Sequence, residues 1–474
     1  MTSDANLYAL IAAAAAAAGD RPVFVEAGEP RLRYDELDGA VAGYAAALAA
    51  SGAKPGDRIL VQAEKSVAGA LLYLASVRAG LVYVPLNTAY TPSELDYFIA
   101  DAEPALIVAP GHLDLADLAG PPAAFETVPR EPDDLAAILY TSGTTGRSKG
   151  AMLSHGALAS NALVLKDYWR WRPGDVLIHA LPIYHVHGLF VALHGALLNG
   201  STMLWHAAFD ADAVIDDLPA ATILMGVPTF YSRLLANPRL TRDAVASMRL
   251  FVSGSAPLLE ATFTDFEART GHHILERYGM TEAGMICSNP YDGARIPGTV
   301  GFPLPGVEAR VADGVLEIRG PNLFNGYWRQ PEKTAEAMRP DGFFITGDMA
   351  VMDGEARVAI VGRAKDLIIA GGLNIYPKEI ELAIDTLPGV AESAVIGVAH
   401  ADLGEAVAAV VVRDDPALDE ATVLAGLSKL ARFKQPRRIL FVEALPRNAM
   451  GKVQKAALRE DYRDLFSPSG PSGS

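Results

Sequence analysis

The segment from Tyr140 to Gly150 constrains the chain more than any other. It reads YTSGTTGRSKG and holds three glycines, five serines and threonines and two cations within eleven residues. The apolar run before it, residues 135–140, predicts a strand, and the Ala/Leu-rich pattern after residue 151 predicts a helix. A strand, a loop of glycine and hydroxyl residues and a helix form a common phosphate-binding arrangement, because glycine lets backbone N–H groups approach the oxygens.

Two other interpretations of this segment are weaker. A Walker P-loop needs a second glycine directly before its lysine and hydroxyl residue, but Ser148 occupies that position, which excludes the motif. A flexible surface loop between strand and helix is the remaining alternative. The density of glycine and hydroxyl residues, together with Lys149, favours phosphate binding over it.

The net charge of −16 and the single cysteine restrict the function further. Nucleic acids and membrane surfaces require a basic face, so an acidic chain is a poor general binder of either. Cys287 alone can form neither an intramolecular disulfide nor a metal site of several cysteines, which fits a reducing, cytoplasmic compartment. No apolar run reaches about twenty residues, so we expect no membrane span.

Strand and helix patterns alternate through the first part of the chain and predict an α/β fold with mostly parallel sheets. Several predicted strands end in glycine-rich or polar loops, at residues 140–150, 226–229, 253–257 and 278–282. Ligands bind such sheets outside the carboxyl ends of the strands, so we expect these loops to line one cleft. His185 and His187 have the spacing of a metal-ligand pair, but polar residues lining the cleft are favoured because no third ligand is evident.

Beyond residue 298 the pattern indicates a β-rich subdomain and then a small α+β domain. Alternating segments on either side of Asp313-Gly314 predict a hairpin. The polar segment 362–366 predicts a linker, and helices are predicted over residues 376–384 and 424–430. The last residues, 467–474, have a disordered composition.

Five segments, in order, resemble the motifs of the adenylate-forming acyl-CoA synthetases, a superfamily of AMP-binding enzymes. They are the segment at 140–150, Tyr278-Gly-Met-Thr-Glu282, Phe344-Ile-Thr-Gly-Asp348, Gly362-Arg-Ala-Lys-Asp366 and Pro446-Arg-Asn-Ala-Met-Gly-Lys452. The resemblance covers almost the whole chain. It implies a large N-terminal adenylation domain over residues 1–364, a small mobile C-terminal domain over 365–466 with Lys365 at the hinge, and a disordered tail over 467–474.

The resemblance also implies a reaction in two halves. A carboxylate attacks the α-phosphorus of ATP and gives an acyl-adenylate and pyrophosphate, and the CoA thiol then attacks the acyl carbon and expels AMP. Lys452 matches the lysine that bridges carboxylate and phosphate, and Thr281 matches the α-phosphate contact. Glu282 and Thr145 match the positions at Mg²⁺, a hard cation that takes oxygen ligands.

Further positions match contacts with the nucleotide. At the β- and γ-phosphates they are Thr141, Ser142, Gly143, Thr144, Thr145 and Lys149. Around adenine and beside it they are Gly254, Ser255, Ala256, Pro257, Glu276, Tyr278, Gly279 and Met280. At the ribose hydroxyls they are Asp348 and its neighbour Arg363.

Within the superfamily, residues 181–190, 276–282 and 288–295 resemble malonyl-CoA synthetases. A second carboxylate on the substrate would need a cation and donors, which Arg277, Arg295 and His187 would supply. The alternative is that the arginines pair with structural acids, such as Glu276 or Asp292. The positions of the pocket wall that decide whether a methyl branch is accepted are matched by Val186 and Met285.

Three functions remain open. The first is a synthetase that joins malonate, with methylmalonate as a further substrate, to CoA with ATP and Mg²⁺. The second is a synthetase for a short or medium monocarboxylic acid, and the third is an adenylation enzyme that loads a carrier-protein thiol. A non-catalytic binding protein is least favoured, since the three catalytic positions are all filled. The expected partners are small molecules, without nucleic acid or membrane, and the chain is expected to be a monomer or homodimer.

Overall fold

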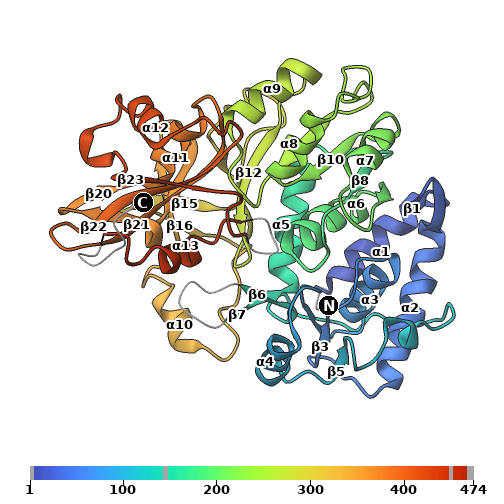
Figure 1. Ribbon diagram of the computed structural model, residues 1–474. Coiled ribbons are helices and arrows are strands. Elements are labelled where there is room, and N and C mark those ends of the chain that lie inside the picture. The colour runs from blue at the N-terminus through green and yellow to red at the C-terminus, as the bar shows by residue number, and fades with distance from the viewer. Residues whose placement is uncertain (1–4, 142–147, 448–451, 467–474) are drawn as a thin grey trace. The chain divides into compact units, whose positions relative to one another are not determined.

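The computed structural model describes residues 5–141, 148–447 and 452–466, so the predicted disordered tail and residues 142–147 lie outside the description. Its contacts divide the chain into two compact units (Figure 1). The first comprises residues 1–309 and 318–344, and the second comprises residues 310–317 and 345–474. The domain boundary predicted between residues 364 and 365 is the point about which the C-terminal domain would move, and it remains a prediction.

A nine-stranded sheet forms the larger part of the first unit, in the order β14-β13-β12-β11-β10-β8-β9-β1-β2. Six neighbouring strands, from β12 to β1 in that order, run parallel. Antiparallel strands complete both edges. The strands are β1 (Pro22–Glu26), β2 (Glu29–Arg33), β8 (Val176–His179), β9 (Thr202–Trp205), β10 (Ile223–Gly226), β11 (Leu250–Ser253), β12 (Leu275–Met280), β13 (Gly284–Ser288) and β14 (Phe302–Pro303).

A five-stranded sheet, in the order β5-β3-β4-β6-β7, completes the first unit. Its first four strands run parallel, and β7 is antiparallel to β6. The bounds are β3 (Arg58–Val61), β4 (Val82–Pro85), β5 (Leu106–Val108), β6 (Leu135–Thr141) and β7 (Lys149–Ser154). Both sheets confirm the predicted α/β class with mostly parallel strands.

The strand β7 corrects the expectation that the segment 140–150 leads directly into a helix. The segment instead connects two antiparallel strands, with Thr141 paired to Lys149. Without β7, the outer side of β6 would leave its N–H and C=O groups unpaired. Helix α5 (His155–Tyr168) begins only after β7, where the Ser154 hydroxyl accepts the N–H of Ala157 at 3.1 Å.

Most of the remaining helices of the first unit pack on these sheets or on one another, with α1 against α2 and α3, whereas α10 has no buried residue. They are α1 (Leu7–Ala18), α2 (Tyr34–Ala50), α3 (Val67–Arg78), α4 (Pro92–Ala102), α6 (His194–Leu197), α7 (Ala211–Asp217), α8 (Pro228–Ala236), α9 (Glu260–Thr270) and α10 (Pro331–Glu336). Short 3-10 helices lie at Leu115–Leu118 and Leu218–Ala220. Among the residues that the structure describes, no helix has the length and apolar character needed to cross a membrane.

The second unit holds most of a four-stranded sheet and all of a five-stranded sheet. The first has the order β15-β16-β17-β18, and the second has the order β20-β19-β22-β21 with β23 beside β22. Its strands are β15 (Glu308–Ala312), β16 (Val315–Arg319), β17 (Phe344–Met352), β18 (Val358–Arg363), β19 (Ile368–Ala370), β20 (Leu373–Ile375), β21 (Val390–His400), β22 (Gly404–Arg413) and β23 (Arg438–Val442). Its helices are η4 (Ala364–Asp366), α11 (Pro377–Asp385), α12 (Glu420–Gly426), η5 (Arg432–Lys434) and α13 (Lys455–Asp461).

Local predictions for this unit have mixed outcomes. The hairpin at Asp313-Gly314 is confirmed, since both residues have the positive φ angles, 50° and 77°, that a two-residue turn requires. The linker predicted over residues 362–366 is wrong, because Gly362 and Arg363 pair with β17 and the next residues form η4. The helix predicted over residues 424–430 lies earlier in the chain, over Glu420–Gly426, where Asp419 caps it.

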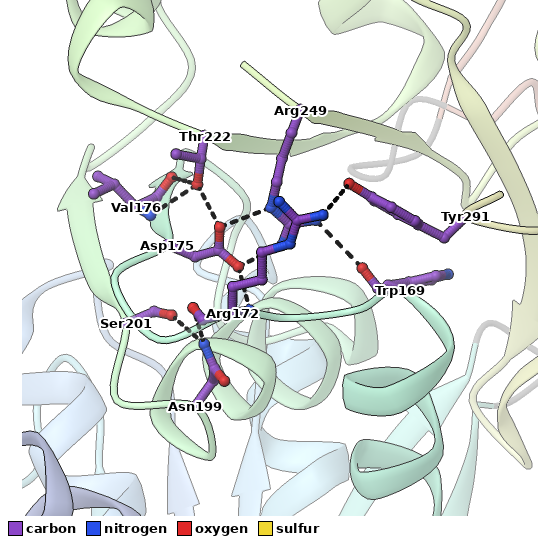
Figure 2. Close-up of polar contacts among 9 residues, drawn as sticks. All are labelled: Trp169, Arg172, Asp175, Val176, Asn199, Ser201, Thr222, Arg249 and Tyr291. Carbon is purple, nitrogen blue, oxygen red and sulfur yellow. Dashed lines mark hydrogen bonds and ion pairs between the residues drawn. The ribbon is translucent and has the colours of Figure 1, made fainter. Parts of the chain in front are cut away.

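One buried carboxylate ties together the starts of three parallel strands of the large sheet (Figure 2). Asp175 directly precedes β8, and it accepts the hydroxyl of Thr222, which precedes β10, at 3.0 Å. Arg249 precedes β11 and donates through Nε to the same carboxylate at 2.7 Å. Arg249 also contacts the hydroxyl of Tyr291, and the N–H of Arg172 donates to Asp175 at 2.7 Å.

The ion pair between Asp175 and Arg249 is predicted to contribute strongly to the stability of the first unit. Asp175→Ala should lower the free energy of unfolding by about 3–5 kcal/mol, because the side chains of Asp175 and Arg249 are 3% and 13% exposed and the mutation leaves the cation uncompensated. Urea unfolding followed by tryptophan fluorescence measures the effect, since all four tryptophans belong to this unit.

The matched control is Arg239→Ala, which removes ion pairs with the exposed Asp212 and Asp216. It should change stability far less, because exposed pairs contribute little. An equal loss in both variants would contradict a special contribution from the buried pair.

Candidate active site

The carboxyl ends of β10 and β11 place a tight turn above the centre of the large sheet. Gly254 follows β11 and donates its N–H to the carbonyl of Gly226 at the end of β10, at 3.3 Å. Ser255 comes next with a φ of 70°, a conformation that costs a non-glycine residue energy and is often found at functional sites. The turn ends where Leu258 donates its N–H to the carboxylate of Glu276, at 3.1 Å.

Arg277, on β12, lies against this turn with its guanidinium buried. The residue is 3% exposed, and a methyl group on Gly254 would come within 3.0 Å of the guanidinium, a separation that Cβ atoms essentially never show. Burial lowers the pKa of Arg277 to about 9, which keeps it cationic at neutral pH. Among the residues that the structure describes, its Nε and Nη2 have no hydrogen-bond partner and no carboxylate pairs with it. The expected alternative, an ion pair with Glu276, is therefore not seen.

His187 lies beside this cation, at the start of a π-helix, η2 (His187–Leu193). Its Nδ1 is 3.4 Å from the hydroxyl of Ser255, and its Nε2 is buried without a partner among the described residues. Burial and then the charge of Arg277 hold the pKa of His187 well below 6.5, so the imidazole is neutral at pH 7. The π-helix, a form that occurs mostly at functional sites, was not predictable from the sequence pattern. Gly188 enables it, because any side chain there would collide with the carbonyl of Pro182.

Two other predicted positions line a small cavity beside this π-helix. Val186 and Thr281 meet at a cavity of about 10 Å³, together with the side chains of Asn161 and Phe190. That volume corresponds to about one water molecule. Met285 is buried next to it, and its N–H donates to the Asn161 amide oxygen at 3.0 Å.

Glu282 and Lys149 are linked by Tyr327, which the sequence analysis missed. The hydroxyl of Tyr327 donates to Glu282 at 3.0 Å, and the ammonium of Lys149 lies 4.8 Å from the centre of the Tyr327 ring. Burial, and then the charge of Glu282, raises the pKa of the Tyr327 hydroxyl, which therefore stays protonated and donates. No motif marks Tyr327 in the sequence, so only the fold reveals this connection.

The other predicted nucleotide positions fall into three groups. Tyr278, Gly279 and Met280 form the last residues of β12, with Tyr278 opposite Cys287 on β13. Ala256 and Pro257 belong to the turn after β11, and the hydroxyl of Thr141 is 3.4 Å from the carbonyl of Lys149. Ser142, Gly143, Thr144 and Thr145 lie outside the described residues.

The contacts of Arg295 favour the structural alternative over a place in the pocket. Its guanidinium donates to the backbone carbonyls of Pro290, Tyr291 and His273, at 3.3, 3.0 and 2.6 Å. The expected acidic partner, Asp292, pairs instead with Arg170. The guanidinium thus holds the loop after β13 in place, and its donors are used there.

The second unit holds the remaining predicted residues. Asp348 and Arg363 face each other on β17 and β18, with Oδ1 and Nε 2.6 Å apart. Lys365 lies in η4, where burial lowers its pKa. Lys452 is exposed and lies three residues before α13.

Glu282 fits the chemistry of a magnesium ligand. Its carboxylate is an oxygen donor that Tyr327 holds in place. Within the described part of the chain, no group of three or more His, Cys, Asp or Glu residues could hold a metal ion by itself. Mg²⁺ commonly binds one or two carboxylates and takes its other ligands from substrate phosphates and water. When bound, it would neutralise charge on the phosphates.

Comparisons with known proteins define the class of this chain. The AMP-binding enzyme family matches residues 11–328, and the AMP-binding enzyme C-terminal domain matches residues 379–452. The chain therefore belongs to the family of AMP-binding enzymes, as its motifs predicted.

Individual proteins of known type are similar to this chain over most of its length. ATP-bound MatB from Rhodopseudomonas palustris is 53% identical with a TM-score of 0.92, and the match covers 98% of this chain and all of that one. A malonate–CoA ligase of Arabidopsis thaliana is 36% identical over 87% of this chain and 79% of the plant protein. A feruloyl-CoA synthase of an Amycolatopsis species is 35% identical over 92% of this chain and 95% of the relative.

The close approach of β12 and β13 predicts that Gly279 cannot be replaced. Gly279→Ala should lower the free energy of unfolding by about 1–3 kcal/mol, because the new methyl group would collide with the carbonyl of Gly284 and with Met285. Urea unfolding measures the change. Gly39→Ala is the control, since Gly39 lies inside α2 with only one neighbour, at 3.4 Å, and alanine favours a helix. A Gly279→Ala variant as stable as the wild type would refute the predicted collision.

Proposed function

We propose that this chain is an ATP-dependent ligase that joins malonate to CoA. A malonate oxygen attacks the α-phosphorus of ATP and the bond to pyrophosphate breaks. The CoA thiol then attacks the acyl carbon of the adenylate, and AMP leaves. Within this proposal Lys452 serves the first step, where its charge bridges carboxylate and α-phosphate, and Thr281 and Glu282 hold the phosphate side.

The buried, unpaired guanidinium of Arg277 is the observation that supports malonate as the acid. A cation without a partner in a buried site is costly, and a second carboxylate on the substrate would compensate it. His187 lies beside it as a neutral imidazole, and its Nε2 has no partner among the described residues. This ring would donate a hydrogen bond to the substrate or accept one from it. The 36% identical malonate–CoA ligase supports the same assignment.

A monocarboxylic acid is the second candidate, because a feruloyl-CoA synthase is similar at 35% identity over a larger share of this chain. Such a substrate would leave Arg277 without an anionic partner. Val186 and Met285 are both 2% exposed, so a large aryl group would have to displace buried side chains more than malonate or its methyl derivative would.

The choice of acid is tested by CoA-dependent AMP formation with malonate, methylmalonate, acetate, butyrate and ferulate side by side. We expect malonate to have a kcat/KM at least about a hundredfold above each monocarboxylate, because those acids leave a buried polar group unpaired. Faster turnover of ferulate or acetate than of malonate would refute the proposal. Methylmalonate should follow malonate within about two orders of magnitude, since one methyl group changes binding by only a few kcal/mol.

Arg277 itself is tested by Arg277→Met, which removes the charge and keeps most of the volume. The kcat/KM for malonate should fall by about tenfold or more, whereas activity with butyrate should stay the same or rise. Steady-state kinetics with both acids measures this change in preference. Arg295→Met is the control, because its guanidinium is bound to backbone carbonyls. Unchanged malonate kinetics in Arg277→Met would remove Arg277 from the pocket.

A further inference from the structure

Two ion pairs attach helix α13 to the second unit just after Lys452. Lys455 Nζ lies 2.5 Å from Glu381 Oε1 on α11, and Arg459 Nη2 lies 2.6 Å from Asp366 Oδ1 in η4. The two cations are four residues apart and therefore lie on the same side of the helix. The helix is thus attached at its first and fifth residues to different elements of its own unit.

The pair with Glu381 is almost completely buried. The side chains of Lys455 and Glu381 are 17% and 8% exposed, and the Glu381 carboxylate also accepts the N–H of Val395 on β21, at 2.9 Å. Loss of one member of such a pair leaves a charge in a place where water compensates it poorly. This contact therefore determines where the start of α13 lies.

The pair with Asp366 joins α13 to the segment that carries Lys365. Asp366 is the neighbour of Lys365, the residue that matches the hinge position, and its side chain is 14% exposed. Between the two cations of α13, Leu458 is buried in a hydrophobic cluster that includes Ala394 and Leu445. The hinge segment and α13 are consequently parts of one packed arrangement.

The backbone between Lys452 and α13 is fixed as well. Val453 forms an isolated β-bridge with Arg447, and Gln454 donates its N–H to the carbonyl of Pro446 at 2.8 Å. Val453 also packs against the cluster around Leu458. Little freedom remains for the chain that leaves Lys452, so a displacement of α13 would be transmitted to this lysine.

We propose that the pairs Glu381–Lys455 and Asp366–Arg459 are positioning pairs for Lys452. They hold α13, and through it the exposed lysine, at a fixed place relative to the hinge segment. This inference rests on the proposed function, in which Lys452 serves the first step, adenylate formation. A lysine that acts in that step alone should leave thioester formation unaffected. Loss of either pair should therefore impair the first half-reaction selectively.

The test compares the two half-reactions in Arg459→Ala and Lys455→Met, using the full chain. Adenylate formation is measured as malonate-dependent exchange of labelled pyrophosphate into ATP, and thioester formation as CoA consumption with a supplied acyl-adenylate. We expect the kcat of exchange to fall by about ten- to a hundredfold, because small displacements of a reacting group have effects of this size. The KM for ATP and the rate of thioester formation should change by less than about threefold. Arg459→Lys, which keeps the charge, should recover most of the exchange activity.

Two controls keep the outcomes separate. Arg463→Ala removes an arginine just beyond α13 whose partners, Glu460 and Asp464, are exposed, and it should leave both half-reactions unchanged. Lys452→Ala should abolish exchange and spare thioester formation. If Lys452→Ala retained exchange, the role of the lysine in the proposed function would fail. If Lys452→Ala behaved as expected but Arg459→Ala and Lys455→Met lost both half-reactions in parallel, or neither, the positioning role would be refuted.

Discussion

The carboxylate of Asp175 sets the geometry on which the rest of the first unit depends. It joins the residues that precede β8, β10 and β11, three neighbours in the large sheet, and Arg249 compensates its charge (Figure 2). These strands are short and pair in parallel register, so fixing their starts also fixes where they end. The candidate site is built on those ends. Its precision is thus supported by a buried ion pair at the opposite edge of the sheet.

At the carboxyl ends of the strands, the site depends on three glycines. Gly254 lies against the guanidinium of Arg277, Gly188 against a carbonyl of the preceding loop, and Gly279 against the neighbouring strand, and in each case a methyl group would collide. The approaches at Gly254 and Gly188 help to position Arg277 and His187, which are both buried. Burial strengthens the attraction of the Arg277 guanidinium for an anion, because little water screens the charge. For the same reason, the guanidinium is costly when no anion compensates it.

Much of the fold follows from local pattern, whereas the site follows only in part. Alternating strands and helices predicted the parallel sheets, and the order of motifs predicted the family. The strand β7 was missed because its six residues, KGAMLS, include no β-branched or aromatic residue, and its strand conformation depends on pairing with β6. Tyr327 connects Lys149 and Glu282 from far along the chain, a contact that no spacing encodes. Arg295 resembled a pocket residue by type, yet its donors are used by backbone carbonyls.

The proposed preference for malonate also depends on the protonation state of His187. Two cations side by side would repel each other and would attract two negative charges, but burial and the neighbouring Arg277 keep this imidazole neutral. The pair thus presents one positive charge, which matches one carboxylate, and a neutral ring that can exchange a hydrogen bond with it. Within the proposed function, a monocarboxylate would use its one carboxylate in the reaction and would leave both groups unpaired, at a cost larger than the gain from extra apolar contact. The proposed preference for a dicarboxylate rests on these two unpaired groups.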